Sequence, residues 1–285
     1  MIKYCNINGT IIKMDRASIP INDVGLLRGY GMFDYFIFEK QFPFFFDDYL
    51  DRFYNSAKAM DLVVPMERSV LKRQILELIH LNQEEEGGLR LLLTAGTSSD
   101  GSGMGRPNLA LVQYKRPRYP EESFTVGSKV ISTNYQRFMA EVKTTNYFVA
   151  LKMAKEIEAA GAVDVLYHHE GWIRESARAN AFFLTKKGTI VTPNEGVLRG
   201  ITRKNLIVAL QGKIEVEERA VHMDELTSFE EAYLTSSIRS IMPIIQIDDI
   251  SIGTGKIGPM FKEIEGLLSN LRMERHEKDR IAIVG

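Results

Sequence analysis

The first hundred residues alternate between apolar strand patterns and amphipathic helix patterns. The segment KYCNINGTIIKM predicts a hairpin, because Asn8-Gly9 between two apolar runs favours a tight turn. The aromatic stretch GMFDYFIFEKQFPFFF predicts β structure, and DDYLDRFYNSAKAMDL predicts a helix with Asp47 or Asp48 as its N-cap. A second helix is expected over residues 66–82. The apolar runs GLRLLLTAG and NLALVQYKR predict two strands on either side of the loop TSSDGSGMGRP.

The remainder of the chain follows KRPRYPEE, whose prolines and charges indicate a linker. SFTVGSKVIS predicts a strand, and residues 145–160 predict a helix closed by Gly161. Further strands are expected in VDVLYH, AFFLTKK, KIEVEERAV and EAYLTSS, and helices in GVLRGITRKNLIVALQG, around residues 223–228 and in GPMFKEIEGLLSNLRM. The charged tail ERHEKDR is expected to be loosely ordered.

These elements predict an α/β fold of the α+β type with two domains. The expected boundaries are 1–115 for a smaller N-terminal domain, 116–121 for the linker and 122–285 for a larger C-terminal domain. The length of 285 residues agrees with two ordinary domains.

Composition narrows the classes of partner. The formal net charge is -1, whereas a nucleic-acid or acidic-membrane surface needs an excess of Lys and Arg, so a small molecule is the better default. Cys5 is the only cysteine, which agrees with a reducing cytoplasm. No run approaches the roughly 20 apolar residues that span a bilayer. The five histidines show no metal-ligand spacing, so no metal site is expected.

Lys143 precedes the predicted helix of residues 145–160, whose buried stripe is expected to comprise Phe148, Leu151, Ala154 and Ile157. A lysine at that position is expected to be half-buried where the loop meets the domain body. Desolvation lowers the pKa of an amine and enables it to form a Schiff base with an aldehyde. Taken alone, however, the pattern is weak and more often describes a surface lysine.

Three other segments contain residues suited to an aromatic phosphate ligand. Glu175, in GWIRESARAN, lies among small residues and could pair with a protonated ring nitrogen; the alternative is a surface pair with Arg174 or Arg178. The helix start in LRGITRKNL offers free amides and the Thr202 hydroxyl to a phosphate, unless Thr202 only caps the helix. The third segment, LTSSIRSIMP, ends a strand in hydroxyls that could bind the same anion or form an ordinary turn.

Two further features bear on an anion. Arg52 could bind a phosphate or pair with Asp48. The loop Gly96–Gly105 lacks the order of a nucleotide P-loop, so a substrate gate or a flexible connection is expected there.

In this order the segments RGYGMFDYF, DDYLDRF, EVKTTNY, GWIRESARAN, TPNEGVLRGITR and LTSSIRSIMPI resemble the fold-type IV (class IV) pyridoxal-phosphate aminotransferases. That group includes branched-chain aminotransferases, D-amino-acid aminotransferases and 4-amino-4-deoxychorismate lyases. The likeness covers most of the chain, and TP followed by LRGITR is its most specific part.

The resemblance implies pyridoxal 5'-phosphate as cofactor and a role for each matching residue. Lys143 would form the Schiff base with the cofactor and move the proton, and Glu175 would keep the pyridine nitrogen protonated. Leu198 would pack against the ring. The phosphate would be bound by Arg52, Ile201, Thr202 and Ser237. The resemblance also implies a homodimer.

Departures from the family pattern fall on the substrate side. Tyr35 stands where the family usually has glycine, and the loop after LTAG lacks the Arg-x-His motif of D-amino-acid aminotransferases. KTTNY is closer to the branched-chain type, in which an aromatic residue near the lysine lines the pocket. The candidate substrate residues are therefore Tyr35, Arg90, Tyr147, Ile238 and Arg239, with a structural salt bridge as the alternative for each arginine.

The sequence therefore predicts a transaminase acting between a hydrophobic, branched-chain-like amino acid and 2-oxoglutarate. A 4-amino-4-deoxychorismate lyase needs the same cofactor residues and is the main alternative. A D-amino-acid aminotransferase and a binding protein without turnover are further alternatives.

Overall fold

The computed structural model describes residues 2–101 and 103–284. Their contacts form two compact units: the first comprises residues 2–117, 142–146 and 275–284, and the second comprises residues 118–141 and 147–274. This grouping differs from the expected domain boundaries in two segments. Residues 142–146 and the end of the chain belong to the first unit because they bond and pack against its β-strands.

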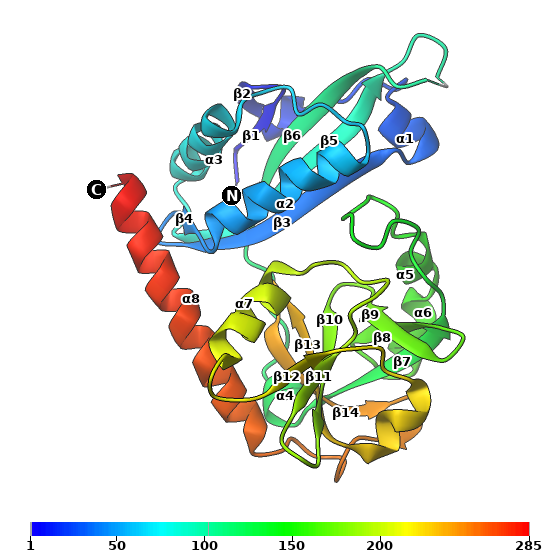
Figure 1. Ribbon diagram of the computed structural model, residues 1–285. Helices are drawn as coiled ribbons and strands as arrows, with labels where there is room; N and C mark the ends of the chain where they lie inside the picture. The colour runs from blue at the N-terminus through cyan, green and yellow to red at the C-terminus, as the bar shows by residue number, and fades with distance from the viewer. Residues whose placement is uncertain (1, 102, 285) are drawn as a thin grey trace. The chain divides into compact units, whose positions relative to one another are not determined.

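The first unit is built on a six-stranded antiparallel sheet in the order β2-β1-β6-β5-β3-β4 (Figure 1). Its strands are β1 (Tyr4–Ile7), β2 (Thr10–Lys13), β3 (Gly31–Glu39), β4 (Phe42–Pro43), β5 (Glu86–Thr97) and β6 (Arg106–Tyr114). Its helices are η1 (Met14–Arg16), α1 (Val24–Arg28), α2 (Phe46–Ala59) and α3 (Arg68–Asn82). The predicted hairpin is present, with Asn8 and Gly9 both at positive φ as its turn requires.

Helix α2 packs against β3 and buries Leu50, Phe53 and Ala57. The expected N-cap was wrong. Helix α2 begins at Phe46 after the left-handed residue Phe45, so Asp47 and Asp48 lie inside its first turn. In the first turn a carboxylate interacts favourably with the positive end of the helix dipole, although it does not cap the helix.

The second unit contains a mixed nine-stranded sheet in the order β12-β11-β10-β13-β14-β7-β8-β9, with β15 paired to β14. Its strands are β7 (Ser128–Asn134), β8 (Asp164–His169), β9 (Trp172–Ser176), β10 (Asn180–Thr185), β11 (Ile190–Thr192), β12 (Val216–Glu218), β13 (Phe229–Ser236), β14 (Ser240–Ile247) and β15 (Ile250–Ser251). Its helices are α4 (Glu122–Thr125), α5 (Phe148–Lys152), α6 (Ala154–Ala159), α7 (Ile201–Leu210) and η2 (Met223–Ser228). Helix α8 (Met260–Val284) begins in this unit and ends in the first.

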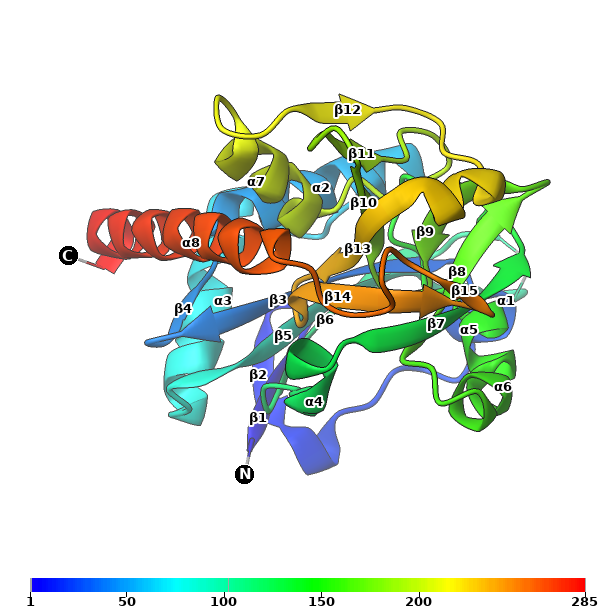
Figure 2. The same cartoon turned by 90° about the horizontal axis from the view of Figure 1, so that it is seen from below.

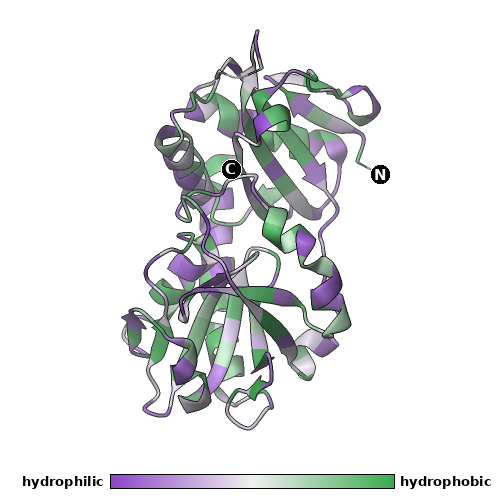
Figure 3. Cartoon of the chain, turned by 90° about the vertical axis from the view of Figure 1, so that its right-hand side faces the viewer, coloured by the Kyte–Doolittle hydropathy of each residue, from purple (hydrophilic) through white to green (hydrophobic). Residues whose placement is uncertain are grey.

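Apolar side chains hold each element of the second unit to the sheet. Helix α7 and the first turns of α8 lie beside β10 and β13 (Figure 2). In the core that these elements share, Leu206 and Phe261 pack with Phe182 and Tyr233. A second core lies around Phe183 and Phe229, whose rings stack with centroids 4.8 Å apart. In Figure 3 apolar colour predominates along the strands, whereas the helices carry both colours, as expected for elements with one face on a core.

Three expected elements differ from the structure. The helix expected over residues 145–160 is divided into α5 and α6. Its expected stripe was wrong at three of four positions, because Phe148 and Leu151 are 69% and 68% exposed and Ala154 is also exposed. Ile157 is buried as expected, and Ala150 is buried with it. The beginning of SFTVGSKVIS forms the short helix α4 before β7 starts at Ser128.

The tail ERHEKDR is not loosely ordered, because it continues α8. Its residue His276 is 1% exposed, and its Nε2 lies 3.1 Å from the carbonyl oxygen of Glu39 and 2.9 Å from that of Phe42. The ring of His276 also packs on Phe44, with centroids 4.3 Å apart. These contacts fix the end of the chain to the turn between β3 and β4. No helix in the described part of the chain is long and apolar enough to cross a membrane.

Candidate active site

Lys143 is fixed to the first unit by its backbone. The carbonyl of Lys143 accepts a hydrogen bond from the amide of Phe33 (2.9 Å), and the amide of Thr145 donates to the carbonyl of Gly31 (2.9 Å). A bridge between Met32 and Thr144 lies between these bonds, so the segment runs antiparallel to the beginning of β3. Lys143 is half-buried, as its place in the sequence predicted.

The ring of Phe33 carries two cations. The Nζ of Lys143 is 4.9 Å from the ring centroid, and the Cζ of Arg90 is 5.1 Å from it. Arg90 also lies over the ring of Tyr114, at 5.3 Å. The aromatic faces attract both cations. The Phe33 ring, near the beginning of β3, is therefore in contact with both an amine and a guanidinium.

Tyr35 lies on the same face of the sheet as Phe33, because alternate residues of a strand point the same way. It pairs with Arg90 across the strands, and its hydroxyl occupies space that a side chain at Gly88 would fill. Tyr35 is 9% exposed, and burial raises its pKa to about 12. The phenol therefore stays protonated at neutral pH.

Arg52 is held by Asp34, which lies one residue beyond Phe33 on β3. Its Nε donates to Asp34 Oδ2 (2.9 Å) and its Nη2 donates to Oδ1 (2.6 Å). The side chains of Arg52 and Asp34 are only 10% and 1% exposed. Asp48, the alternative partner considered from the sequence, lies 3.7 Å from Arg275. A bidentate pair of this kind fixes the plane of the guanidinium.

Glu175 lies on β9 in the second unit and is 5% exposed. Its Oε2 accepts a hydrogen bond from the amide of Leu198 (2.9 Å), and its Oε1 lies 3.1 Å from Arg137 Nε. The surface pair with Arg174 or Arg178 that the sequence left open is therefore wrong. The buried Glu175 carboxylate pairs with a residue that is distant in the sequence, Arg137.

Arg137 connects Glu175 to an aromatic cluster in the same unit. Its Nη2 donates to the carbonyl of Ala177 (2.6 Å), and its Cζ lies 4.7 Å from the ring centroid of Tyr147 and 5.4 Å from that of Tyr167. Tyr147 is half-buried in the core formed by α5, α6 and β8. Tyr147 therefore supports the guanidinium that orients Glu175.

Helix α7 begins at Ile201 after the extended residue Gly200, which as a glycine has no side chain to cap the helix. The alternative that Thr202 caps the helix is wrong, because Thr202 is the second helical residue. A side chain at position 200 would lie 2.1 Å from Asn180 Oδ1, so glycine is required there. Asn180 also donates through Nδ2 to the carbonyl of Leu198 (2.8 Å). The uncapped first turn presents amides and a positive dipole end, which suit a phosphate.

The end of β13 runs into further hydroxyls. Thr235 is 1% exposed, and its Oγ1 has no hydrogen-bond partner among the residues that the structure describes. Thr235 pairs with Asn180 across the sheet, and the side chain of Asn180 is the one that approaches Gly200. Ser237 and Ile238 follow in the turn and are half-buried. A buried hydroxyl without a partner is unusual in a folded protein, and a ligand that accepts a hydrogen bond from it would satisfy it.

Arg239 does not face an open site in the second unit. It is 2% exposed, and its Nη1 lies 2.6 Å from Oδ2 of the fully buried Asp164. Its Cζ lies 4.9 Å from the ring centroid of Tyr119, and its Nη2 donates to the carbonyl of Val163 (3.3 Å). Burial opposes the charged form of Arg239, but the Asp164 charge outweighs burial and raises its pKa. These contacts are those of the structural salt bridge that the sequence left open.

The loop after β5 is anchored at its base. Asn22 donates through Nδ2 to the carbonyl of Ser98 (3.2 Å), and Ser98 Oγ donates to Asp100 Oδ1 (2.8 Å). Ser102, inside the predicted gate, lies outside the described residues. The expectation of a gate therefore stays a prediction.

The family model for class IV aminotransferases ("Amino-transferase class IV") matches residues 31–247, which include the candidate amine, carboxylate and helix start described above. The chain belongs to the class IV aminotransferase family. This confirms the family resemblance and the α+β fold class predicted from the motifs.

Relatives of this class IV aminotransferase have more than one specificity in their names. The chain is 27% identical to a D-alanine aminotransferase of Bacillus licheniformis over 271 residues, covering 92% of this chain and 95% of the relative. It is 25% identical to a putative branched-chain-amino-acid aminotransferase of Methanocaldococcus jannaschii over 278 residues, covering 93% and 95%. A solved branched-chain amino acid aminotransferase from T.th., crystallised with pyridoxamine 5'-phosphate, matches with a TM-score of 0.87 at 24% identity, covering 97% and 96%.

Class IV aminotransferases depend on pyridoxal 5'-phosphate, so the predicted cofactor class is confirmed. The cofactor has an aldehyde, a ring nitrogen and a phosphate. The chain provides a matching group for each: the amine of Lys143, the buried carboxylate of Glu175 and the uncapped start of α7. The unpartnered hydroxyl of Thr235 is a further donor next to that helix start. The residues present fit the cofactor.

Sequence reasoning missed several residues of this class IV aminotransferase that hold the predicted ones in place. Asp34, Arg137 and Phe33 are the clearest, and each contacts a predicted residue. Asp34 and Phe33 lie within the segment RGYGMFDYF that carried the resemblance, so their place in a motif was an available signal. Arg137 lies in no such segment and had none.

Proposed function

We propose that the protein is a transaminase that moves an amino group between a hydrophobic, branched-chain-like amino acid and 2-oxoglutarate. The observation that carries the proposal is the pair of cations on Phe33. Lys143 supplies an amine 4.9 Å from the centroid of this ring, and Arg90 supplies a guanidinium 5.1 Å from it. Amino-group transfer needs both groups close together, because the substrate carries its carboxylate one carbon from the reacting amine.

In this proposal Lys143 and Glu175 serve different ends of the cofactor. When bound, pyridoxal 5'-phosphate supplies an aldehyde that accepts the amino group and a ring that accepts electrons. Nζ of Lys143 would hold the cofactor through its aldehyde and, once the amino group of the substrate has displaced it, would be free to carry the proton that the substrate loses. The Glu175 carboxylate, paired with the charge of Arg137, would bind the protonated ring nitrogen.

The phosphate is assigned to Arg52, to the amides of Ile201 and Thr202, and to the hydroxyls of Thr202 and Ser237. Leu198 is assigned to one face of the ring, and its backbone is fixed through its amide by Glu175 and through its carbonyl by Asn180. Arg52 is favoured because Asp34 has already set its orientation, which lowers the entropy lost on binding.

For the substrate, Arg90 is assigned to the carboxylate, and Tyr35, Tyr147 and Ile238 are assigned to the apolar walls. Arg90 is exposed, and it lies over the rings of Phe33 and Tyr114. Arg239 is not assigned to the substrate because its guanidinium already pairs with Asp164.

Reconstitution with pyridoxal 5'-phosphate tests the cofactor assignment. We expect a yellow protein whose chromophore is fixed by borohydride onto Lys143, identified by peptide mass mapping. Lys143→Ala should lose both the label and the activity. Lys152→Ala, which changes an exposed lysine on α5, should keep both. A label at another lysine, or an active Lys143→Ala protein, contradicts the assignment.

The substrate assignment is tested with the reconstituted protein and three reactions. Glutamate formed from L-leucine and 2-oxoglutarate supports the proposal. Pyruvate and 4-aminobenzoate released from aminodeoxychorismate without a 2-oxo acid identify a lyase instead. The third reaction is transfer from D-alanine to 2-oxoglutarate. No turnover in any of the three, with Lys143 labelled, points to a binding protein.

Transfer from D-alanine is a second candidate function. It is favoured by the D-alanine aminotransferase of Bacillus licheniformis, whose 27% identity extends over 92% of this chain. The loop after LTAG, which lacks the Arg-x-His motif, argues against it. Pyruvate formed from D-alanine and 2-oxoglutarate, at a kcat/KM above that for L-leucine, would establish this candidate in place of the first.

We also propose that the protein forms a homodimer. In the second unit Phe138, Phe148 and Leu151 are 86%, 69% and 68% exposed, and exposed apolar side chains of this size are typical of interfaces. Sedimentation equilibrium should give twice the chain mass of 32.4 kDa. Phe148→Lys should weaken the dimer, whereas Lys155→Glu, at an exposed site on α6, should not. A wild-type monomer rules the proposal out.

A further inference from the structure

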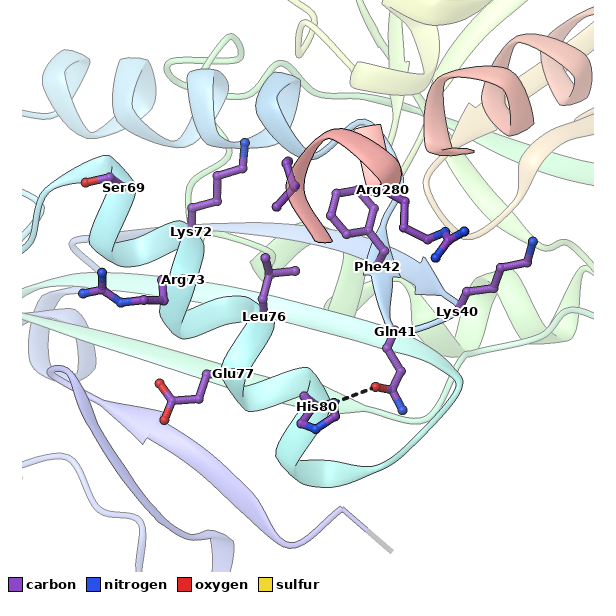
Figure 4. A pocket seen from close by; sticks show the side chains of 11 residues that line it. Lys40, Gln41, Phe42, Ser69, Lys72, Arg73, Leu76, Glu77, His80 and Arg280 are labelled. Atoms are coloured by element: carbon purple, nitrogen blue, oxygen red, sulfur yellow. Dashed lines mark hydrogen bonds between the residues drawn. The ribbon is translucent and has the colours of Figure 1, made fainter. Parts of the chain in front are cut away.

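The first unit contains a cavity of about 660 Å³ between α3, the β3–β4 turn and the last turns of α8. Figure 4 shows Phe42 and Leu76 at its centre, with Lys72 on one side and Arg280 and Lys40 on the other. Cavities of this size are typical of sites for small organic ligands.

The charge around the cavity is predominantly positive. Four of its lining residues are cations, Lys40, Lys72, Arg73 and Arg280, and Glu77 is the one carboxylate among the described lining residues. Ion-pair partners reduce this excess without removing it. Asp47 accepts from Lys72 at 3.0 Å, and a single carboxylate, Glu277, serves both Arg280 (2.8 Å) and Lys40 (3.9 Å). Counting these two partners, four cations face three carboxylates in the described part of the chain.

The base of the cavity is apolar. Phe42 is 1% exposed, and Leu76 and Ile283 add aliphatic surface from α3 and α8. Two contacts hold the turn that contains Lys40 and Gln41. The Gln41 side chain bonds to His80 Nδ1 (3.0 Å), and His276 Nε2 lies 2.9 Å from the carbonyl oxygen of Phe42. The cavity therefore combines a positive rim with a preformed apolar base.

This cavity is separate from the residues assigned to the cofactor in the same unit. Phe33, which contacts Lys143, and Lys40, on the rim, are seven residues apart along β3 and the turn after it. At about 3.3 Å per strand residue this separation is roughly 23 Å. A ligand in the cavity would not touch Lys143.

We propose that this cavity binds a small organic anion with an apolar body, such as an aryl sulfonate or a hydrophobic carboxylate. The apolar part lies on Phe42, Leu76 and Ile283. The anionic group pairs with Lys40 and Arg280, the two cations that share one carboxylate partner. This site does not depend on the proposed transaminase activity.

The test uses full-length protein saturated with pyridoxal 5'-phosphate, so that the cofactor site is occupied. The probe is 8-anilinonaphthalene-1-sulfonate, followed by its fluorescence, and the uncharged comparison probe is N-phenyl-1-naphthylamine. We expect one saturable site for the sulfonate and at least roughly tenfold weaker binding of the neutral probe, which corresponds to about 1.4 kcal/mol.

Matched variants locate the site. Lys40→Glu reverses a rim charge and Ile283→Asp places a charge on the apolar wall, and each should weaken sulfonate binding about tenfold or more. Lys58→Glu, on the exposed face of α2, and Ile281→Asp, on the same helix as Ile283, should leave it within about twofold. Arg73→Glu, on the α3 wall, provides a further variant should either of the first two fold poorly.

The proposal is overturned if no saturable sulfonate binding occurs. It is also overturned if the neutral probe binds as tightly as the sulfonate. Equal sulfonate affinity in wild type and all cavity variants would place the bound probe elsewhere on the protein and would overturn it as well.

Discussion

Arg52 and Asp34 form a bidentate ion pair that is almost completely buried in the first unit. Asp34 is next to Phe33, which contacts Lys143. Two neighbouring residues of β3 therefore contact Arg52, which is proposed to bind the phosphate, and Lys143, the proposed reactive amine. The orientation of Arg52 is therefore set by the strand as well as by its own helix.

Asp34→Asn should weaken binding of pyridoxal 5'-phosphate by about tenfold, because the amide loses one charge-assisted bond and no longer fixes the guanidinium. Binding of pyridoxal, which has no phosphate, should be unchanged. Absorbance titration of the apoprotein measures both. Asp48→Asn, on α2, serves as the control.

If Asp34→Asn weakens the binding of pyridoxal 5'-phosphate and of pyridoxal equally, Asp34 acts only through the stability of the protein. Arg52→Ala separates this prediction from the proposed function. If Arg52→Ala leaves the preference for the phosphorylated ligand intact, Arg52 does not bind the phosphate.

Arg137→Gln should lower kcat by roughly tenfold to a hundredfold, because Glu175 loses the charge that orients it. A double-mutant cycle is the sharpest measurement. In a Glu175→Gln background, Arg137→Gln should cost little further activity, since its partner is already gone. Additive losses would mean that Arg137 does not act through Glu175. Arg178→Gln, a half-exposed arginine of the same unit, is the control.

Arg90→Gln should raise KM for a branched-chain amino acid by roughly tenfold to a hundredfold, since a charge-assisted bond to the carboxylate is lost. Steady-state kinetics with 3-methylbutylamine, which lacks the carboxylate, provide the internal control. The amine should react equally with wild type and variant. A parallel loss for both substrates contradicts the assignment, and Arg106→Gln on the exposed part of β6 should change neither.

His276→Leu should destabilise the protein by about 1–3 kcal/mol, because the carbonyls of Glu39 and Phe42 lose a buried donor. Thermal unfolding should show a melting temperature lower by several degrees. His80→Leu alters an exposed histidine of the same unit and should change it much less. An unchanged melting temperature for His276→Leu would show that the end of α8 contributes nothing to the stability of the unit.

The sequence predicted most strands and the family, because alternating apolar patterns and collinear motifs are local signals. The candidate amine, the buried carboxylate and the uncapped helix start were found in the same way. Their partners were not. Arg52 lies 18 residues from Asp34, and Glu175 lies 38 residues from Arg137, so neither partner was among the sequence neighbours that were considered.

Helical periodicity misled at two places for a related reason. In residues 145–160 more than one set of positions is apolar, and Ala150 is buried together with the predicted Ile157, whereas Phe148 and Leu151 are exposed. In the tail, the run of charges indicated solvent on every side. The single ring of His276 is covered by Phe42 and Phe44, which lie more than 230 residues earlier in the chain.

The first unit is assembled from three separate stretches of chain, which limits how the protein can be divided. A fragment that ends at residue 117 lacks both the 142–146 segment bonded to β3 and the His276 ring beneath the β3–β4 turn. During synthesis, this unit cannot be completed until the last residues emerge from the ribosome. Its folding therefore cannot be completed before all residues of the second unit have been synthesised.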